Sequence, residues 1–201
     1  MRAMMHGILR RRAEQLFKRL QPHLPVAGRT LDVGSGTGHN GAAIEKHTRL
    51  SVVKLDVTDM NAVGGPVVVY DGEKIPFPDQ AFQVVISLFV LQYIADPVAF
   101  LSELRRTGRG RLLIIQSVYA GVLGEVVLRA REFVQGRGAF RAARALKLVP
   151  NGADRMRPVH FYTLEELQAV FERAELEVVE HHRSRWLGLG VSRDLYVLEW
   201  S

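Results

Sequence analysis

The sequence contains no cysteine. This absence excludes disulfide bonds, thiolate metal ligands and enzymes that attack their substrate with a cysteine thiolate, such as the cysteine-dependent base methyltransferases. We predict no metal site.

Long hydrophobic runs are also missing. No segment approaches the roughly 18 apolar residues of a membrane span, and arginines interrupt the first twelve residues before a signal peptide could form. We therefore expect a cytoplasmic protein, with peripheral membrane association as a further expectation. Its 201 residues are 47% hydrophobic, which is enough for one core, so we predict a single domain over residues 1–201.

Three glycines at alternate positions follow a short apolar run. Leu31-Asp32-Val33 leads into Gly34, Gly36 and Gly38, and a helical pattern begins directly afterwards. The pattern predicts a strand, a tight loop and a helix whose first N–H groups face a ligand. The nicotinamide fingerprint requires a sixth-position glycine, and His39 stands there instead, so that cofactor is not predicted.

Acidic residues end the next two predicted strands. Leu50–Leu55 finishes on Asp56, 18 residues beyond Gly38, where a doubly wound sheet places the acceptor for ribose hydroxyls. A turn aspartate is the alternative. The run Val67–Tyr70 then ends on Asp71, followed by Gly72.

The segments Ile75-Pro76-Phe77-Pro78-Asp79, Phe82–Leu88 and Leu91–Pro97 complete a pattern over residues 29–117. This pattern resembles the class I S-adenosylmethionine (SAM)-dependent methyltransferases, in particular the type 11 small-molecule family. The resemblance implies SAM as the cofactor and places Asp71 on the adenine amino group. The residues that it implies for cofactor binding are Asp32, Gly34, Ser35, Gly36, Thr37, Gly38, Asp56, Val57, Asp71, Gly72, Glu73 and Leu88.

The resemblance also predicts the fold. We expect a Rossmann-like, doubly wound α/β domain with a mostly parallel seven-stranded sheet and an antiparallel last strand. Residues 175–182 and 194–200 are expected to supply the antiparallel pair that ends the fold. Only 14 residues separate Asp56 from Asp71, so the second crossover helix is expected to be a turn or a stub. Asp96-Pro97 predicts a helix start, and Thr163 with Glu166 predicts a capping box.

Basic charge is concentrated in two segments. Residues 1–20 carry six basic groups and one acidic group, and residues 129–157 carry eight and two, within a net charge of +6. Residues 1–22 predict an amphipathic helix that packs on the sheet edge or, as the resemblance implies, covers the cofactor. Residues 119–158 predict a helical lid. Its second helix carries Arg137, Arg141, Arg144 and Lys147, and we expect both basic segments to meet over the cofactor.

Three functions follow as alternatives. The first is methyl transfer to a small-molecule or lipid-like acceptor, expected to be anionic or amphiphilic. The second is methylation of nucleic acid or protein, which the basic segments suggest. Ser87-Leu88-Phe89-Val90 is not the Asn/Asp-Pro-Pro-aromatic motif of base amino-group methylation, so we do not expect a nucleic-acid partner. The third is a non-catalytic SAM-binding module.

Four side chains are candidates for contact with the acceptor. They are Tyr93, Tyr119, His160 and Tyr162. Tyr93 and His160 are the predicted catalytic residues, although packing or capping is the more frequent role of such residues. The family's paired histidines are replaced here by Gln92 and Tyr93, so a histidine base at that position is lacking.

Overall fold

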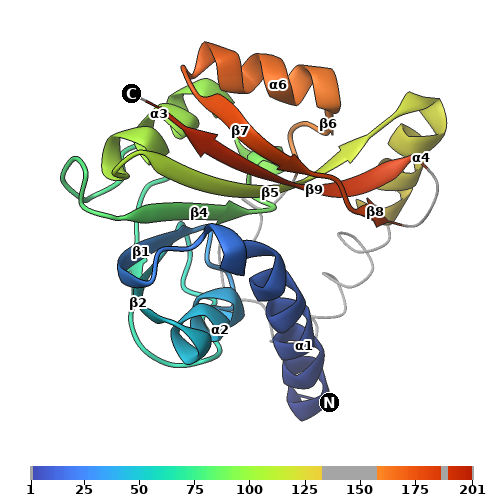
Figure 1. The fold of residues 1–201 in the computed structure, drawn as a ribbon. Coiled ribbons are helices and arrows are strands. Elements are labelled where there is room, and N and C mark those ends of the chain that lie inside the picture. Colours follow the sequence, from blue (N-terminus) through green and yellow to red (C-terminus); the bar gives the residue numbers. More distant parts are fainter. Residues whose placement is uncertain (1, 133–157, 187–189, 201) are drawn as a thin grey trace.

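A computed structural model of the chain describes residues 2–132, 158–186 and 190–200 (Figure 1). The strands are β1 (Ala27–Val33), β2 (Arg49–Asp56), β3 (Val67–Val69), β4 (Val84–Leu88), β5 (Arg111–Tyr119), β6 (Tyr162–Thr163), β7 (Glu177–His182), β8 (Arg185–Trp186) and β9 (Val191–Glu199). The helices are α1 (Arg2–Leu20), α2 (His39–His47), α3 (Pro97–Thr107), α4 (Gly121–Glu132) and α6 (Leu164–Arg173), with short 3-10 turns η1 (Gln21–His23) and η2 (Leu91–Tyr93).

One sheet organises the domain. Its main path runs β3-β2-β1-β4-β5-β9-β7, in which the strands from β3 to β5 are parallel and β9 is antiparallel to both of its neighbours. This confirms the predicted seven-stranded, mostly parallel sheet. The two-residue strands β6 and β8 pair with β5 and β9 off this path. Strand β9 begins at Val191, earlier than expected, because it pairs with the whole of β5, from Arg111 to Tyr119.

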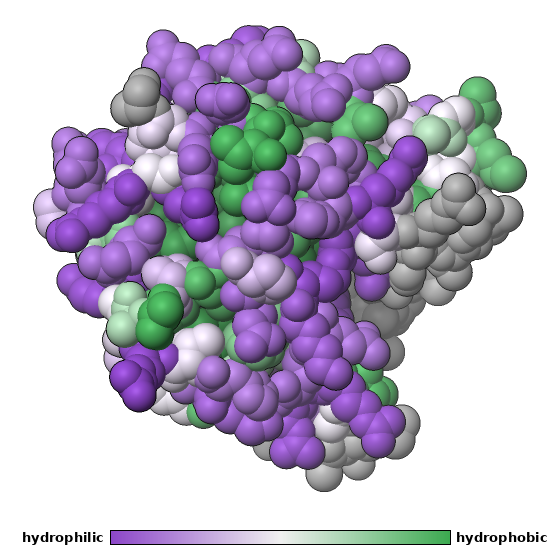
Figure 2. Space-filling view, in the orientation of Figure 1, coloured by the Kyte–Doolittle hydropathy of each residue, from purple (hydrophilic) through white to green (hydrophobic). Residues whose placement is uncertain are grey.

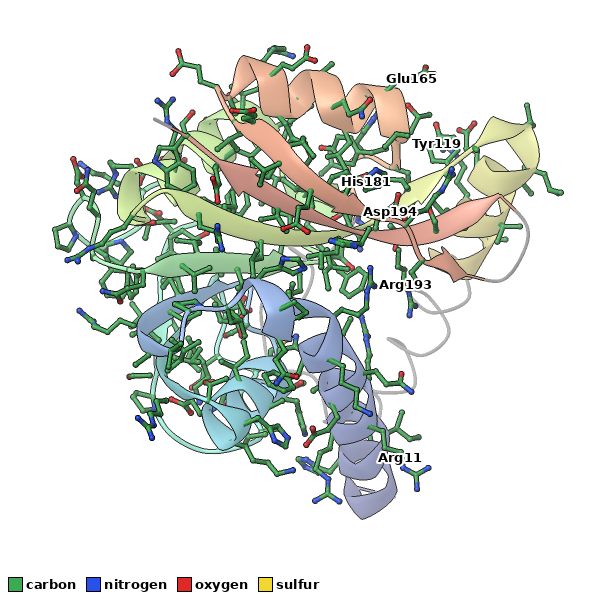
Figure 3. The ribbon with its side chains drawn as sticks, in the orientation of Figure 1. Arg11, Tyr119, Glu165, His181, Arg193 and Asp194 are labelled. Carbon is green, nitrogen blue, oxygen red and sulfur yellow. The ribbon has the colours of Figure 1, made fainter. Side chains whose placement is uncertain are left out.

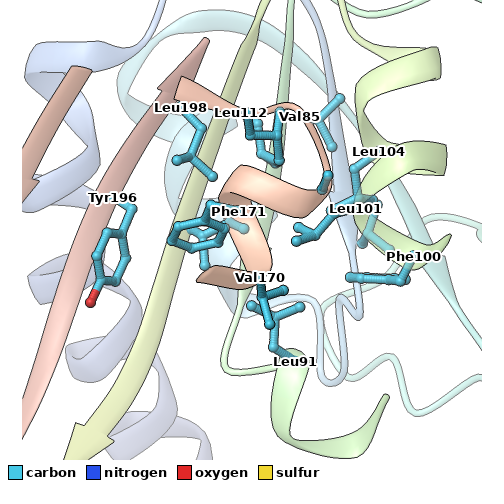
Figure 4. Close-up of a cluster of buried hydrophobic side chains, with 14 of the residues drawn as sticks. Val85, Leu91, Phe100, Leu101, Leu104, Leu112, Val170, Phe171, Tyr196 and Leu198 are labelled. Atoms are coloured by element: carbon cyan, nitrogen blue, oxygen red, sulfur yellow. The ribbon is translucent and has the colours of Figure 1, made fainter. Parts of the chain in front are cut away.

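Helices cover both faces of the sheet (Figure 1). On one face, α1 and α2 enclose a core with alternate residues of β4, β5 and β9. On the other face, α3 and α6 pack over the opposite alternate residues, including Val85, Leu112 and Leu198 (Figure 4). Because successive side chains of a strand point to opposite faces of the sheet, each central strand contributes residues to both cores.

Helix α1 lies on a face of the sheet and not on its edge. Ala13, Leu16, Phe17 and Leu20 recur at helical spacing and are all buried in the core that β4, β5 and β9 share with α2. The edge placement was therefore wrong, because this apolar stripe is broad enough to cover the central strands.

The helix starts follow the predicted chemistry. The Asp96 side chain accepts a hydrogen bond from the Ala99 N–H at 3.0 Å, with Pro97 in the first turn of α3. Thr163 and Glu166 form a reciprocal capping box at the start of α6. These contacts satisfy N–H groups that have no partner within their helix.

The second crossover is a loop, as expected. Residues 57–66 contain no helix, and the Asn61 side chain donates hydrogen bonds to the carbonyls of Gly64 and Gly65. Lys54 on β2 also donates to the Gly64 carbonyl, which fixes the loop against the sheet.

The predicted insertion is described only in its first part. Tyr119 belongs to β5, and α4 follows from Gly121. The predicted basic stripe on residues 137–147 lies outside the described residues. None of the helices in the described ranges is long and apolar enough to cross a membrane.

Candidate functional site

A cavity of 680 Å³ opens at the carboxyl ends of the central parallel strands. Its lining comes from the segments that follow β1, β2, β3 and β4, with one wall from α1 and another from the start of α3. This is where an open parallel sheet binds its ligand, because the loops diverge where the strand order reverses between β1 and β4. The volume suits a ligand of nucleotide size.

The three glycines of the loop serve different purposes. A Cβ at Gly34 would collide with Val90, and a Cβ at Gly38 would collide with Asn61 and Val63. Gly36 has a φ of +53°, and a Cβ there would meet nothing within 4 Å. The space beside Gly36 belongs to the cavity, so only this glycine leaves room for a ligand instead of a protein side chain.

Asp56 at the end of β2 faces this loop. Its Oδ2 accepts a hydrogen bond from the Gly36 N–H at 2.7 Å, and the residue is only 6% exposed while lining the cavity. A buried carboxylate beside a glycine loop is placed to accept hydroxyl groups of a ligand.

The turn after β3 forms the opposite side of the cavity. Asp71 accepts hydrogen bonds from the N–H groups of Glu73 and Lys74 at 2.8 and 3.2 Å, and these bonds hold its pKa below the usual value. Burial, together with the charges of Asp56 and Asp71, raises the pKa of Tyr70 to about 12, so its phenol remains a neutral donor.

The predicted cofactor residues line this cavity with two exceptions, Asp32 and Gly38. Asp32 is 1% exposed and lies behind the loop, so it does not face the cavity. Burial and the nearby Asp56 raise the pKa of Asp32 to about 7, against the opposing charge of Lys54. Gly38 caps the start of α2, and its role is steric.

The predicted catalytic residues are separated in the structure. Tyr93 on η2 lines the cavity. His160 does not: it lies in a separate pocket of 450 Å³, where its Nε2 is 3.6 Å from Glu166. The Val159 N–H bonds to the Gln92 carbonyl, and Ile94 and Ala95 line both spaces, so Tyr93 and His160 line neighbouring pockets. A catalytic role of either residue stays a prediction.

The other two aromatic candidates are also outside the cavity lining. Tyr162 is 3% exposed and its hydroxyl donates to the Leu91 carbonyl at 3.4 Å, which makes it a core residue. Tyr119 ends β5 and pairs with β6.

Several residues that line the cavity belong to none of the sequence motifs. Leu9 and Arg12 come from α1, and the Arg12 guanidinium lies 4.8 Å above the ring of Phe89. Phe89 follows β4 with a φ of +62°, a backbone conformation that is rare outside glycine. Arg193 of β9 lies 5.5 Å from the same ring and extends toward α1 (Figure 3). The amphipathic stripe through Leu9 was the only sequence signal for this wall.

The start of α2 contributes His39 and Asn40 to the lining. The Nδ1 of His39 contacts the Thr37 hydroxyl at 2.9 Å, and its Nε2 lies 3.3 Å from His6 on α1. Burial, with a smaller effect of His6, lowers the pKa of His39. The pair joins α1 to the glycine loop.

Comparisons with known proteins agree with this geometry. A family model described as a methyltransferase domain matches residues 5–181. The ubiquinone/menaquinone biosynthesis C-methyltransferase UbiE of Burkholderia mallei (strain SAVP1) is 31% identical over 121 residues, which cover 52% of this chain and 49% of that protein. The chain therefore spans about half the length of the curated relatives it matches.

Solved structures share the fold. A SAM-dependent methyltransferase from Aquifex aeolicus aligns with a TM-score of 0.58 at 17% identity, over 93% of this chain and 89% of that chain. Another neighbour is the geranyl diphosphate C-methyltransferase from Streptomyces coelicolor A3(2), solved with Mg²⁺, geranyl diphosphate and S-adenosyl-L-homocysteine. It aligns with a TM-score of 0.66 at 13% identity, over 93% of this chain and 79% of that chain.

Proposed function

Since the chain belongs to the methyltransferase-domain family of SAM-dependent enzymes, we propose that it transfers the methyl group of SAM to a small, lipid-like acceptor. The observation that carries this proposal is the cavity in which Gly36 leaves open space beside the buried carboxylate of Asp56. If Gly36 served only as a turn residue with positive φ, no acid would be needed beside it. The carboxylate of Asp56 at the end of β2 lines the same cavity, which favours a ligand site.

The residues present fit SAM. Asp56 would accept the ribose hydroxyls, and the turn of Asp71 to Glu73 would contact the adenine. Gly36 leaves room for the backbone to approach the ligand, and His39 and Asn40 in the first turn of α2 line the same space. A cavity of 680 Å³ leaves space for part of an acceptor as well.

The acceptor end is proposed to lie beyond β4. There Leu9, Phe89 and Tyr93 give the cavity an apolar lining, and Arg12, whose guanidinium lies over the Phe89 ring, adds a positive charge to it. This combination favours an acceptor with an apolar body and an anionic group, and the name of the UbiE relative, for quinone biosynthesis, supports an acceptor of small-molecule type.

A peripheral membrane contact is part of the same proposal. Val122, Leu123 and Val126 are all more than half exposed on α4, where Figure 2 shows apolar side chains at the surface. An amphiphilic acceptor would reach the cavity from a membrane surface that such residues touch.

Methyl transfer requires alignment more than chemical activation. SAM, when bound, would supply a methyl group already activated by its sulfonium sulfur. The chain's residues would then have to orient the acceptor atom toward that methyl group. Tyr93 lines the cavity and is proposed to orient the acceptor through its hydroxyl.

The proposal is tested first by calorimetry with S-adenosylhomocysteine and with NAD. We expect saturable binding of S-adenosylhomocysteine and no binding of NAD. A chain that did not bind S-adenosylhomocysteine would refute SAM as the cofactor. Transfer of labelled methyl is then measured on prenylated acids, hydroxyquinones, neutral lipids, RNA and protein. Transfer to RNA or protein alone would refute the small-molecule acceptor.

The acceptor end is tested by Arg12→Gln, with Arg11→Gln as the matched control. Both residues lie on exposed positions of α1, but only Arg12 lines the cavity. Loss of a charged hydrogen bond should raise the KM for anionic acceptors about tenfold in Arg12→Gln alone, with unchanged affinity for S-adenosylhomocysteine. Equal effects of both variants would refute a specific contact.

The role of Tyr93 is tested by Tyr93→Phe beside His160→Ala. We expect a lower kcat in the first variant, at unchanged cofactor affinity, and no change in the second, because His160 lies outside the cavity. If His160→Ala lost activity while Tyr93→Phe kept it, the assignment would be reversed.

A further inference from the structure

A group of metal-ligating side chains lies away from the cavity, where the segment after α1 meets the edge strand β7. It consists of His23 on η1 and of Glu180 and His182 on β7. We propose that these three residues form a binding site for a divalent transition-metal ion such as Zn²⁺. None of them lines the cavity, so this site is independent of the proposed function.

The donor atoms are already close together. The His23 Nδ1 is 3.3 Å from Glu180 Oε1, and the His182 Nε2 is 2.9 Å from Glu180 Oε2. All three donor groups lie within 4.8 Å of one another, and no other group of three such residues in the described part of the chain does so. The carboxylate thus stands between two imidazoles, with one oxygen facing each.

Local structure explains this convergence. Glu180 and His182 are two positions apart on a strand, so their side chains leave the same face. Their partner His23 is only 7% exposed, which fixes its ring against the domain. Arg19, in the last turn of α1, donates to the carbonyls of His182 and Arg193 at 3.4 and 2.8 Å and holds the helix end beside these strands.

The donor set selects the class of metal. Two imidazoles and a carboxylate suit Zn²⁺ and its transition-metal neighbours, whereas Ca²⁺ and Mg²⁺ prefer oxygen ligands alone. Tetrahedral Zn²⁺ with ligands at about 2.0 to 2.1 Å separates its donor atoms by about 3.4 Å, close to the two measured contacts. His182 has a half-exposed side chain that can rotate to close the site, and water would take the open position.

The charges at the site support a cation of moderate affinity. Glu180 brings a carboxylate, which is negative at neutral pH and attracts a cation. The guanidinium of Arg19, which donates a hydrogen bond to the His182 carbonyl, lies nearby, and its positive charge disfavours the binding of a cation. The expected consequence of binding is a tighter link between the end of α1 and the edge strand.

Sequence patterns did not indicate this site. More than 150 residues separate His23 from Glu180, and only the tertiary fold brings β7 beside the segment after α1. The pair Glu180 and His182 taken alone is a short polar run on an edge strand.

The test titrates the metal-free full chain with ZnCl₂ in a calorimeter, at pH 7.5 and at pH 5.5. We expect one ion per chain at pH 7.5 and weaker binding at pH 5.5, because imidazole binds metal only in its neutral form. Zinc at about 100 times its Kd should raise the melting temperature by about 5 to 10 °C, and a chelator should reverse the rise.

Three variants locate the ion. His182→Ala and Glu180→Gln should each weaken binding at least about tenfold, which corresponds to about 1.4 kcal/mol. The matched control is His47→Ala, since His47 also contacts a glutamate, Glu14, at 2.7 Å, but Lys46 replaces a second histidine there. Zinc binding that is absent, or that is unchanged in both site variants, would overturn the proposal, as would an equal loss in the control.

Discussion

Replacing Asp56 gives the sharpest test of the cavity. Its carboxylate is 6% exposed and already oriented by the Gly36 N–H at 2.7 Å, so a ligand hydroxyl would meet a fixed acceptor. Hydrogen bonds to a charged group contribute about 1.5 to 3 kcal/mol each, and water partly replaces them after truncation. We therefore expect Asp56→Ala to weaken S-adenosylhomocysteine binding by about 1.4 to 3 kcal/mol, or roughly 10- to 150-fold in Kd.

Two companion variants separate charge from structure. Asp56→Asn keeps an oxygen for the Gly36 N–H but loses the charge, so its Kd should lie between those of the parent and Asp56→Ala. Asp59→Ala removes an exposed carboxylate of the neighbouring loop, which lies outside the cavity lining, and should leave binding unchanged. The measurement is calorimetry with S-adenosylhomocysteine. A Kd for Asp56→Ala within twofold of the parent would refute the ribose contact.

Three further predictions concern the loop, pH and stability. Gly36→Ala should abolish S-adenosylhomocysteine binding in calorimetry. The control is Gly64→Ala, because Gly64 also has a positive φ and open space but does not line the cavity. Both variants should lose about 1 kcal/mol of stability in melting curves from the backbone conformation, and only Gly36→Ala should lose binding. The folded chain holds the proton of Asp32 up to about pH 7, while the unfolded chain releases it near pH 4, so the stabilisation from Asp32 is greatest below pH 4 and is lost as the pH rises through 7. The melting temperature of Asp32→Asn should therefore rise relative to the parent between pH 4.5 and 8, and a constant difference would contradict the raised pKa. Arg106→Leu, which removes donors to two loop carbonyls and two carboxylates, should lower stability by about 2 kcal/mol in urea unfolding, and an unchanged midpoint would contradict this role.

The motif-bearing half of the site could be predicted from sequence because its signals are local. The glycine spacing, the acid at each strand end and the cap at Asp96 each need only a few neighbouring residues to be recognised. The same holds for the capping box at Thr163. Glu175 follows α6 with a φ of +56°, so a charged residue adopts the left-handed conformation that glycine usually takes after a helix.

The acceptor side of the cavity could not be predicted in this way. The contact of Arg12 with Phe89 joins residues 77 positions apart, and the positive φ of Phe89 arises from the turn after β4, without glycine or asparagine to signal it. The pocket that His160 lines could not be predicted either, since its segment is placed by a backbone bond between Val159 and Gln92 that no side-chain pattern encodes.

The position of β9 has a consequence for how the protein is made. Strand β9 comes last among the strands in sequence, yet it lies between β5 and β7. Until the ribosome has delivered β9, the edge of β5 exposes unpaired backbone along Arg111–Tyr119, and β7 has no neighbour on the main path of the sheet. Folding during synthesis therefore cannot close the sheet one strand at a time, and the edge of β5 stays open to association with other chains until β9 pairs with it.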